Sequence, residues 1–300
     1  MGGFVALTKP RIIELLLITT VPTMVLAEKG WPSTWLVLVT LVGGTLAAGG
    51  ANAINMVVDR DIDKLMPRTQ NRPLVTGLVK PREAMVFAIV LEVIAFAVLW
   101  RFANLLSAVL ALSAMLFYVF VYTLWLKRTS TQNIVIGGAA GAVPVLVGWA
   151  AVRNDVTWAP VVLFVVMFLW TPPHFWALAI ARKDEYAKAG IPMLPVTHGV
   201  PYTRLQVLLY TVLLVLVTLM PWIVRMSGLV YLAAVLLLNA RFLYYAFALK
   251  MTERAELPMK VFRFSITYLM WLFVALLVDH YIPTTQLPTP PPYGPEVFGP

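Results

Sequence analysis

The sequence contains no cysteine among its 300 residues. Without cysteine the chain can form no disulfide, no thiolate zinc site, no iron–sulfur cluster and no covalent c-type haem attachment. Any haem is held without a covalent bond or is itself a substrate.

Charged residues are also scarce. They make up 12% of the chain against 60% hydrophobic residues, and the mean hydropathy is +0.83. So few polar side chains cannot cover a soluble globule of this length, and the composition is typical of an integral membrane protein. A helical span needs roughly 20 mainly apolar residues. Breaks at charged residues, Pro and Gly leave nine candidate spans, near 12–27, 34–57, 84–100, 104–126, 132–152, 157–181, 205–224, 229–249 and 264–281.

The first apolar run is not followed by a small-residue cleavage site, so we expect a helix there and not a signal peptide. With the amino terminus inside, 18 of the 23 Lys and Arg residues lie on the cytoplasmic side, four lie outside and Arg241 lies within a span. The positive-inside rule then predicts a cytoplasmic amino terminus, and an odd number of spans places the carboxyl terminus outside. Because the net charge of +9 follows the membrane, we expect no nucleic-acid partner.

Two connections on the predicted cytoplasmic side are long and rich in charge, at 58–83 and 182–203. Function is concentrated in such loops. The segment 283–300 is rich in Pro and is expected to be disordered. We therefore predict a single transmembrane domain over 1–282, an all-helical fold in the cell membrane, and an active site on the cytoplasmic side.

The richest motif is a run of acids at the end of the second span. On a helix, Asn55, Asp59 and Asp63 follow one another at intervals of four residues and share one face. Like charges at this spacing destabilise a helix by about 0.2–0.5 kcal/mol, so packing alone does not favour the arrangement. A cation between the carboxylates removes the repulsion. Mg²⁺ suits one or two carboxylates and completes its shell with water and substrate phosphate.

Basic residues follow the acidic run. Arg68 and Arg72, with Lys64 nearby, supply the fork-shaped donors that a diphosphate needs. The alternative is a solvated loop start, in which the acids only pair with Arg60 and the other basic residues. We favour a carboxylate–magnesium–diphosphate site because Asn55 shares the face of the two acids and the arginines come directly after them.

These residues resemble a known family. The pattern from Asn55 to Asp63, followed by Met66-Pro-Arg68-Thr and Arg72-Pro-Leu74, is similar to the first signature of the UbiA superfamily of intramembrane prenyltransferases. More narrowly it resembles the haem O synthase family, and the likeness runs from Thr8-Lys-Pro-Arg11 through all nine spans. The resemblance implies a helical bundle around a central cavity. It implies a catalytic set of Asn55, Asp59, Asp63, Arg68, Arg72 and Lys127. It implies further diphosphate contacts from Arg11, Lys64, Arg128, Asn133 and Lys183.

The second polar loop departs from the wider superfamily. Most members that prenylate phenols carry a second D-x-x-x-D motif there, and this chain instead has Asp184 and Glu185. A lone histidine in a span is usually a packed residue, but the pair Pro172-Pro173 is expected to break the helix and turn His174 toward a pocket. The resemblance implies that His174 and His198 contact haem. It also makes Asp184 and Glu185 candidate metal ligands, acting less directly than a second aspartate pair.

The family resemblance implies a reaction. It is the Mg²⁺-dependent transfer of a farnesyl group from farnesyl diphosphate to the vinyl group of haem b, with addition of water, which gives haem O. Haem b is then a substrate and not a prosthetic group. The expected partners, besides the lipid bilayer, are haem A synthase or the assembly machinery of a terminal oxidase.

Three alternatives remain open. A UbiA-type enzyme acting on a quinone or chlorophyll precursor would share Asn55 to Asp63 but should carry the second aspartate motif. A secondary transporter would place charged or unwound segments near the midplane in both halves, whereas the acids here gather at one end. A non-catalytic haem-binding assembly protein would need His174 and His198 but not the diphosphate residues.

Overall fold

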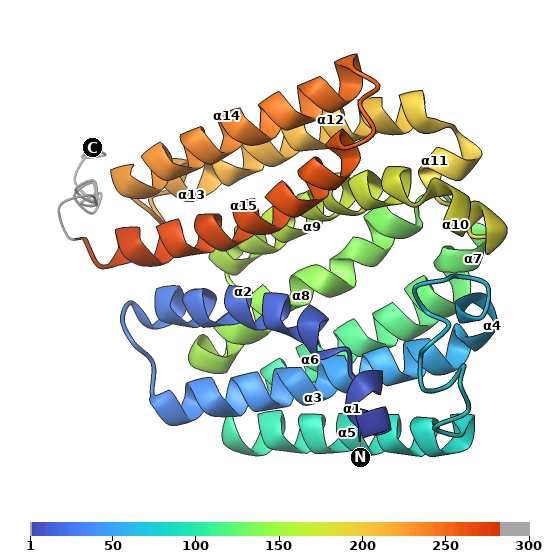
Figure 1. The fold of residues 1–300 in the computed structure, drawn as a ribbon. Coiled ribbons are helices and arrows are strands. Elements are labelled where there is room, and N and C mark those ends of the chain that lie inside the picture. Colours follow the sequence, from blue (N-terminus) through green and yellow to red (C-terminus); the bar gives the residue numbers. More distant parts are fainter. Residues whose placement is uncertain (1, 283–300) are drawn as a thin grey trace, which may run out of the picture.

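The protein is a bundle of long helices that are aligned along one main direction (Figure 1). The computed structural model describes residues 2–282, and for residues 11–17 it describes the backbone without the side chains. This part of the chain contains no strand. The predicted tail 283–300 lies outside the described residues. The long helices are α2 (Pro10–Glu28), α3 (Thr34–Val58), α5 (Pro81–Phe102), α6 (Leu105–Leu116) continued by the π-helix η1 (Phe117–Leu126) and α7 (Lys127–Thr129), α8 (Asn133–Arg153), α9 (Trp158–Ala181), α12 (Val200–Thr218) with α13 (Met220–Ile223), α14 (Leu229–Met251) and α15 (Leu257–His280).

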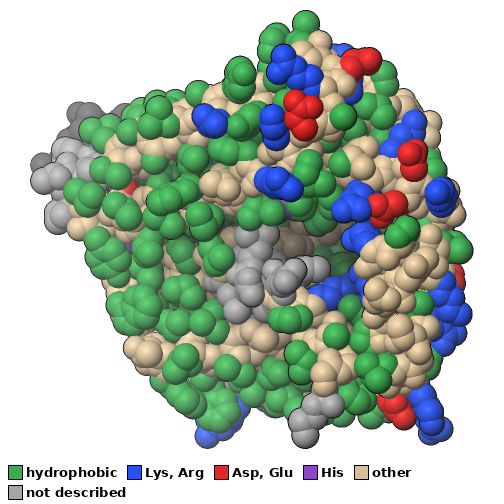
Figure 2. Space-filling view, in the orientation of Figure 1, with side chains coloured by type: hydrophobic (Ala, Val, Ile, Leu, Met, Phe, Trp, Pro, Cys, Tyr) green, Lys and Arg blue, Asp and Glu red, His purple; other side chains and the backbone are tan. Residues whose placement is uncertain are grey.

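Eight helical segments in the described part of the chain are long and apolar enough to cross a membrane. α2 is 19 residues long, and its described portion Ile18–Glu28 is apolar as well. Hydrophobic side chains cover most of the visible face, and charged ones gather toward one end (Figure 2). The fold is therefore that of an all-helical, multi-pass membrane protein, as predicted. The number of nine spans and the orientation of the termini remain predictions.

Prolines and left-handed residues set where several helices begin and end. Pro10 and Pro81 occupy the first positions of α2 and α5, where a missing N–H removes no hydrogen bond. Lys29 and Asn154 adopt left-handed conformations directly after α2 and α8. α5, α12 and α15 begin at 81, 200 and 257, before the predicted starts at 84, 205 and 264, because a basic residue in each first part, Arg82, Arg204 or Arg263, interrupts the apolar run without ending the helix.

Helix α9 continues without a break through Pro172 and Pro173. The prediction of a broken helix before His174 is therefore wrong. Each proline lacks the N–H that would bond to the carbonyl four residues earlier. Residues 171–174 are all buried among neighbouring helices, and a helix in such surroundings tolerates unpaired carbonyls that lipid would not.

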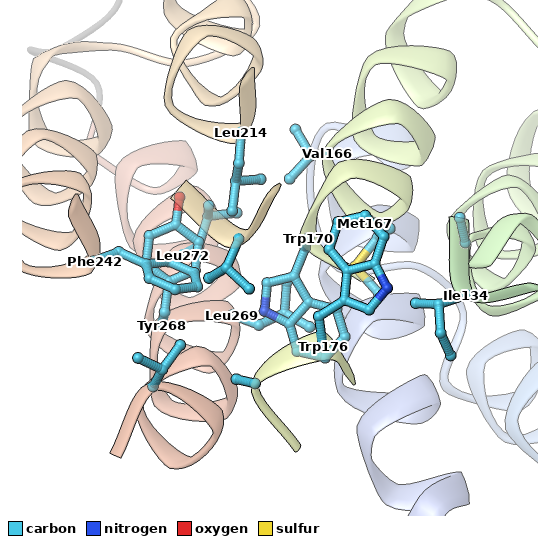
Figure 3. Packing of buried hydrophobic residues seen from close by; sticks show 14 of the residues in the cluster. Ile134, Val166, Met167, Trp170, Trp176, Leu214, Phe242, Tyr268, Leu269 and Leu272 are labelled. Atoms are coloured by element: carbon cyan, nitrogen blue, oxygen red, sulfur yellow. The ribbon is translucent and has the colours of Figure 1, made fainter. Parts of the chain in front are cut away.

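The largest hydrophobic core lies among α9, α12, α14 and α15 (Figure 3). Trp176, Phe242 and Tyr268 are among the largest fully buried side chains. A chain of polar groups crosses this core. Tyr268 Oη donates to Asn239 Oδ1 at 2.7 Å, and Asn239 Nδ2 donates to Thr218 Oγ1 at 3.1 Å. These bonds join α15, α14 and α12, so the carboxyl-terminal helices form one interlocked block.

Helices α3 and α5 pack closely through glycine. A Cβ added to Gly43 would lie 2.6 Å from the side chain of Leu99, and one added to Gly50 would lie 2.7 Å from Oε1 of Glu92. Glu92 is buried, and its Oε1 has no hydrogen-bond partner among the described residues. The glycines of α3 therefore let α5 approach closely, with the side chains of Leu99 and Glu92 lying directly over them.

Short helices and a turn-rich segment form one end of the bundle, which we call the polar end. It consists of α4 (Arg60–Asp63), residues 64–80, α7, α10 (Lys183–Lys188) and α11 (Leu194–Thr197). These helices lie together at the right of Figure 1. The amino-terminal helix α1 (Gly2–Leu7) also reaches this region, because Leu7 is fully buried in a cluster with Met56, Leu74 and Val79. α1 thereby fastens the segment 64–80 onto the end of α3.

Candidate functional site

The acidic run lies where α3 ends and α4 begins. The helical spacing is maintained across this junction, because the backbone N–H of Asp59 donates to Asn55 at 2.9 Å and that of Asp63 donates to Asp59 at 2.8 Å. Asn55, Asp59 and Asp63 are all buried, whereas Asp61 is exposed. The structure thus places the amide and the two carboxylates on one inward face, as their spacing predicts.

The two oxygens of Asp59 have different surroundings. Its Oδ2 accepts from Asn55 Nδ2 at 2.8 Å and from Lys127 Nζ. Its Oδ1 is buried and has no hydrogen-bond partner among the described residues, although a guanidinium nitrogen of Arg128 lies 3.8 Å away. A fully buried carboxylate with an unused oxygen is unfavourable unless something else coordinates it. Asp59 therefore offers an oxygen ligand to a cation.

Lys127 reaches Asp59 from a π-helical stretch. Two contacts in the same register join the end of α3 to η1 and α7, Asn55 to Thr123 at 3.2 Å and Asp59 to Lys127. In η1 the Thr123 hydroxyl donates to the carbonyl of Tyr118, five residues earlier, at 2.8 Å. π-Helical turns are often found at functional sites. In this stretch the side chains of Thr123 and Lys127 both face the end of α3, where they contact Asn55 and Asp59.

Asp63 is paired with a different cation. One Arg72 guanidinium nitrogen contacts both of its oxygens, at 2.8 and 2.6 Å. The chain turns back to allow this, because the Thr69 hydroxyl donates to the backbone carbonyl of Asp63 at 2.8 Å. Each buried carboxylate therefore has its own basic partner, Lys127 for Asp59 and Arg72 for Asp63.

Arg128 binds the exposed acid of the run. Its guanidinium donates to both oxygens of Asp61 at 2.8 Å and to the carbonyl of Val58 at 2.9 Å. The hydrogen bonds from Arg128 lower the pKa of Asp61 to about 2. The contact joins α7 to the end of α3. It also holds Arg128 at the edge of the site, beside Asp59.

The second polar loop meets the first through Glu185. This residue accepts from Arg182 at 2.5 Å, and its other oxygen lies 3.8 Å from Nε of Arg68. The Arg68 guanidinium also lies over the ring of Tyr186, at 6.0 Å, and burial raises the pKa of that phenol. Asp184 is exposed. The two predicted sides of the site therefore touch, with arginine already pairing Glu185.

The predicted metal ligands do not form a compact cage of acids. No group of three or more His, Asp or Glu side chains arranged to hold a metal occurs among the described residues. Asp59 and Asp63 lie on one helix face with Asn55, whereas Glu185 is directed to Arg182 and Arg68. A metal bound here would need oxygen ligands from substrate or water to complete its shell.

His174 is buried in the α9–α15 interface. Its Nδ1 lies 2.6 Å from the Ser265 hydroxyl, and that hydroxyl donates to the carbonyl of Phe262 at 2.7 Å. Nδ1 must therefore be the protonated nitrogen, which leaves Nε2 as an acceptor. The imidazole stacks against Trp170 and Phe262, with centroids 4.3 and 4.6 Å away. His174 is thus packed and hydrogen-bonded, in a tautomer whose Nε2 carries the lone pair.

His198 lies in different surroundings. It is exposed after α11, contacts the Thr197 hydroxyl at 2.9 Å and stacks on Tyr202. The structure therefore does not bring the two histidines into one common environment. A role for each in contacting haem remains a prediction.

The remaining predicted diphosphate residues are dispersed. Lys64 is exposed and Lys183 is half-buried. Asn133 is buried at the start of α8, where its amide donates to the carbonyl of Ser130 at 2.8 Å and its Oδ1 has no partner among the described residues. The side chain of Arg11 lies outside the described residues.

Two residues at the site were not predicted from the sequence. Lys9 donates from Nζ to Asn55 Oδ1 at 2.8 Å, and Thr123 accepts from the same amide. Both contacts cross more than forty residues of sequence, so no local spacing could indicate them. The signals for Lys9 are its place directly before Pro10, at the start of the first span, and its position within Thr8-Lys-Pro-Arg11, where the family resemblance begins.

The UbiA prenyltransferase family matches residues 16–276 of the chain. A protoheme IX farnesyltransferase from Clavibacter michiganensis subsp. michiganensis (strain NCPPB 382) is 52% identical over 284 residues, which cover 94% of this chain and 93% of the relative. Protoheme IX farnesyltransferase 1 from Saccharopolyspora erythraea is 54% identical over 282 residues, which cover 93% of this chain and 90% of the relative.

Solved structures share the fold at lower identity. A structure of digeranylgeranylglyceryl phosphate synthase has a TM-score of 0.78 at 20% identity, and the match covers 93% of this chain and 98% of that chain. A UbiA homologue from Archaeoglobus fulgidus bound to DMAPP and Mg²⁺ has a TM-score of 0.64 at 16% identity, covering 92% and 99%. The family match and the curated relatives each extend over most of the chain, and the chain belongs to the UbiA prenyltransferase family.

Proposed function

We propose that the protein transfers the farnesyl group of farnesyl diphosphate to a vinyl group of haem b, with addition of water, to give haem O. Relatives that share half of its residues and carry the name protoheme IX farnesyltransferase support this activity. The observation that carries the site assignment is the unpartnered Oδ1 of fully buried Asp59, with Lys127 and Arg128 converging on the same carboxylate.

The carboxylates at this site are suitable ligands for a magnesium ion. Asp59 and Asp63 would hold it, because both are buried carboxylates and one oxygen of Asp59 has no donor. A protein of the same fold was solved with DMAPP and Mg²⁺, which supports the choice of metal. When bound, the ion supplies positive charge that neutralises the departing diphosphate. Asp184 and Glu185 would act less directly, through water, because Asp184 is exposed and Glu185 is only half-buried, whereas Asp59 and Asp63 are buried.

The chain's own cations would bind the diphosphate. Lys127 and Arg72 lie against the two buried carboxylates, so a diphosphate held at these acids meets both side chains. Hydrogen bonds from ammonium and guanidinium groups to phosphate oxygens strengthen as negative charge develops on the leaving group. Further contacts are proposed for Arg11, Lys64, Arg68, Arg128, Asn133 and Lys183.

The reaction follows from loss of the diphosphate. The bond between C1 of the farnesyl group and oxygen breaks, and its electron pair leaves with the diphosphate. The resulting allylic cation takes the π pair of the haem vinyl group, which forms the new carbon–carbon bond. Water then adds to the cation on the former vinyl carbon and loses a proton. The apolar interior of the bundle would exclude water from the earlier step.

The haem contacts are proposed for His174 and His198. For His174 the support is the tautomer set by Ser265, because a histidine that binds iron donates its other ring N–H to a fixed acceptor. For His198 the support is exposure near the polar end, where a large planar ligand can reach it. Haem b is a substrate in this scheme and not a prosthetic group.

We further propose that the domain over 1–282 lies in the cell membrane with the polar end toward the cytoplasm. The uneven distribution of Lys and Arg supports this orientation. A product as apolar as haem O would pass within the bilayer to haem A synthase or to the assembly machinery of a terminal oxidase.

The test is turnover of purified protein with haem b, farnesyl diphosphate and Mg²⁺, followed by mass analysis of the haem. We expect Asp59→Ala and Asp63→Ala to lose farnesyl transfer by at least about a hundredfold, because each removes a buried ligand and leaves a cation unpaired. Glu253→Ala is the control, since this acid is exposed, pairs with Arg204 away from the site and should keep most activity.

Wild-type turnover in Asp59→Ala or Asp63→Ala would refute the metal–diphosphate assignment. Absence of any farnesyl adduct of haem in the wild-type reaction would refute the choice of acceptor. A prenylated quinone or chlorophyll precursor formed under the same conditions would then identify the acceptor class instead.

A further inference from the structure

Lys9 is a basic residue in the site whose role the reaction scheme has not used. It precedes α2 and adopts a left-handed conformation, with φ 52° and ψ 61°. Such a conformation is uncommon for a residue with a side chain and persists only where the surroundings hold it. Pro10 follows at the first position of the helix, so the left-handed turn lies directly before the chain enters α2.

Contacts on both sides fix this turn. The Asn52 amide donates to the carbonyl of Thr8 at 3.1 Å, and the Thr8 hydroxyl donates to Val5 at 2.8 Å. Leu7 is fully buried against the end of α3 and the segment 64–80. The turn is therefore anchored on the same elements that carry the carboxylates and Arg72. Its strained conformation points Nζ of Lys9 at the amide oxygen of Asn55, 2.8 Å away.

Lys9 differs from Lys127 and Arg72 in the kind of group that it contacts. Asp59 is paired with Lys127 and Asp63 with Arg72, whereas the hydrogen bond of Lys9 goes to a neutral amide, and no salt bridge from it occurs among the described side chains. Burial, together with the nearby charges of Arg72 and Lys127, lowers the pKa of Lys9 to about 7. Lys9 is therefore a basic side chain of the site that is not paired with an acid among the described residues.

We propose that Lys9 is a diphosphate-binding residue, which the amino-terminal segment delivers to the Asn55–Asp59 face so that an incoming diphosphate contacts cations from three separate segments of the chain. The other two segments are α7, which supplies Lys127, and the turns after α4, which supply Arg72. This inference rests on the proposed function, because it assigns one more contact to the same diphosphate. A structural role alone would need only a hydrogen-bond donor to Asn55, and a charge would be a disadvantage there.

The decisive variant separates the charge from the hydrogen bond. Lys9→Gln keeps an N–H donor that can reach Asn55 but removes the positive charge, and Lys9→Arg keeps the charge. The probe is inorganic pyrophosphate with Mg²⁺, titrated calorimetrically into the full-length protein in detergent. Thermal unfolding is followed in parallel. The matched control is Lys29→Gln, since Lys29 is also left-handed, flanks the opposite end of α2 and is exposed.

We expect Lys9→Gln to weaken pyrophosphate binding by about tenfold or more, as loss of a charge-assisted hydrogen bond requires. Lys9→Arg should recover binding to within about threefold, and Lys29→Gln should bind as the wild type does. KM for farnesyl diphosphate should rise in Lys9→Gln, while the unfolding temperature stays unchanged.

Pyrophosphate binding by Lys9→Gln within twofold of a binding-competent wild type would overturn the role of Lys9 and leave the proposed function intact. A wild-type protein that does not bind pyrophosphate with Mg²⁺ would instead overturn the diphosphate site itself, and with it the role of Lys9. If Lys9→Gln does not fold, Lys9→Arg decides, because tenfold weaker binding by a folded Arg variant contradicts a simple charge contact.

Discussion

The placement of Tyr122 depends on the absence of a side chain at Gly137. A Cβ at this position would lie 2.3 Å from Cδ2 of the Tyr122 ring, and that ring stacks on Tyr118 with centroids 5.4 Å apart. Both tyrosines belong to η1, the helix that presents Thr123 and Lys127 to α3. A change at Gly137 therefore reaches the site through the position of η1.

We predict that Gly137→Ala destabilises the protein by about 1–3 kcal/mol, because the added methyl group overpacks a helix interface. Farnesyl transfer should fall as η1 shifts. Thermal unfolding in detergent and turnover measure the two effects. Gly141→Ala, one turn further along α8, is the control, since a Cβ there meets nothing within 4 Å. Equal behaviour of the two variants would contradict the argument.

The residues of the site differ in how far the sequence predicts them. Asn55, Asp59 and Asp63 follow from a spacing of four residues that is kept from α3 into α4, and all three are buried. Lys9 and Thr123 contact Asn55 across 46 and 68 residues of sequence. Such contacts depend on how α2, α3 and η1 pack together, and no pattern within one segment contains that information.

The sequence also predicts the helices only in part. Apolar run lengths predict the long helices closely, because a membrane span requires a fixed number of apolar residues. Run lengths do not reveal that η1 is π-helical. They also do not reveal that α9 continues through Pro172 and Pro173, because burial among neighbouring helices decides whether the unpaired carbonyls are tolerated.

The hydrogen bonds that link Tyr268, Asn239 and Thr218 join α15, α14 and α12, and their contribution to helix packing can be tested. Asn239→Leu leaves the hydroxyls of Tyr268 and Thr218 without their amide partner in the core, and we expect a loss of about 1 kcal/mol in unfolding free energy. Unfolding by denaturant in mixed micelles measures it. Tyr268→Phe removes the other end of the contact. The double variant should lose less than the sum of the two, and strict additivity would show that Asn239 and Tyr268 are not coupled.

For the molecule as a whole, the absence of cysteine makes the predicted orientation directly testable. Gln70→Cys and Thr157→Cys introduce single thiols at exposed positions on opposite ends of the bundle, and no native thiol has to be removed. We expect a membrane-impermeant maleimide to label Thr157→Cys in intact cells. Gln70→Cys should react only after permeabilisation. The reverse pattern would place the polar end outside and contradict the positive-inside argument.

The two halves of the bundle are packed in different ways. Large side chains and buried hydrogen bonds interlock α9, α12, α14 and α15, whereas α3 and α5 meet through glycine, with smaller clusters around them. Small residues let the backbones of neighbouring helices approach closely with fewer large side chains locked between them. We therefore expect the amino-terminal helices, which carry the two buried carboxylates, to open locally more readily than the carboxyl-terminal block. Such opening would admit a long prenyl tail and a macrocycle.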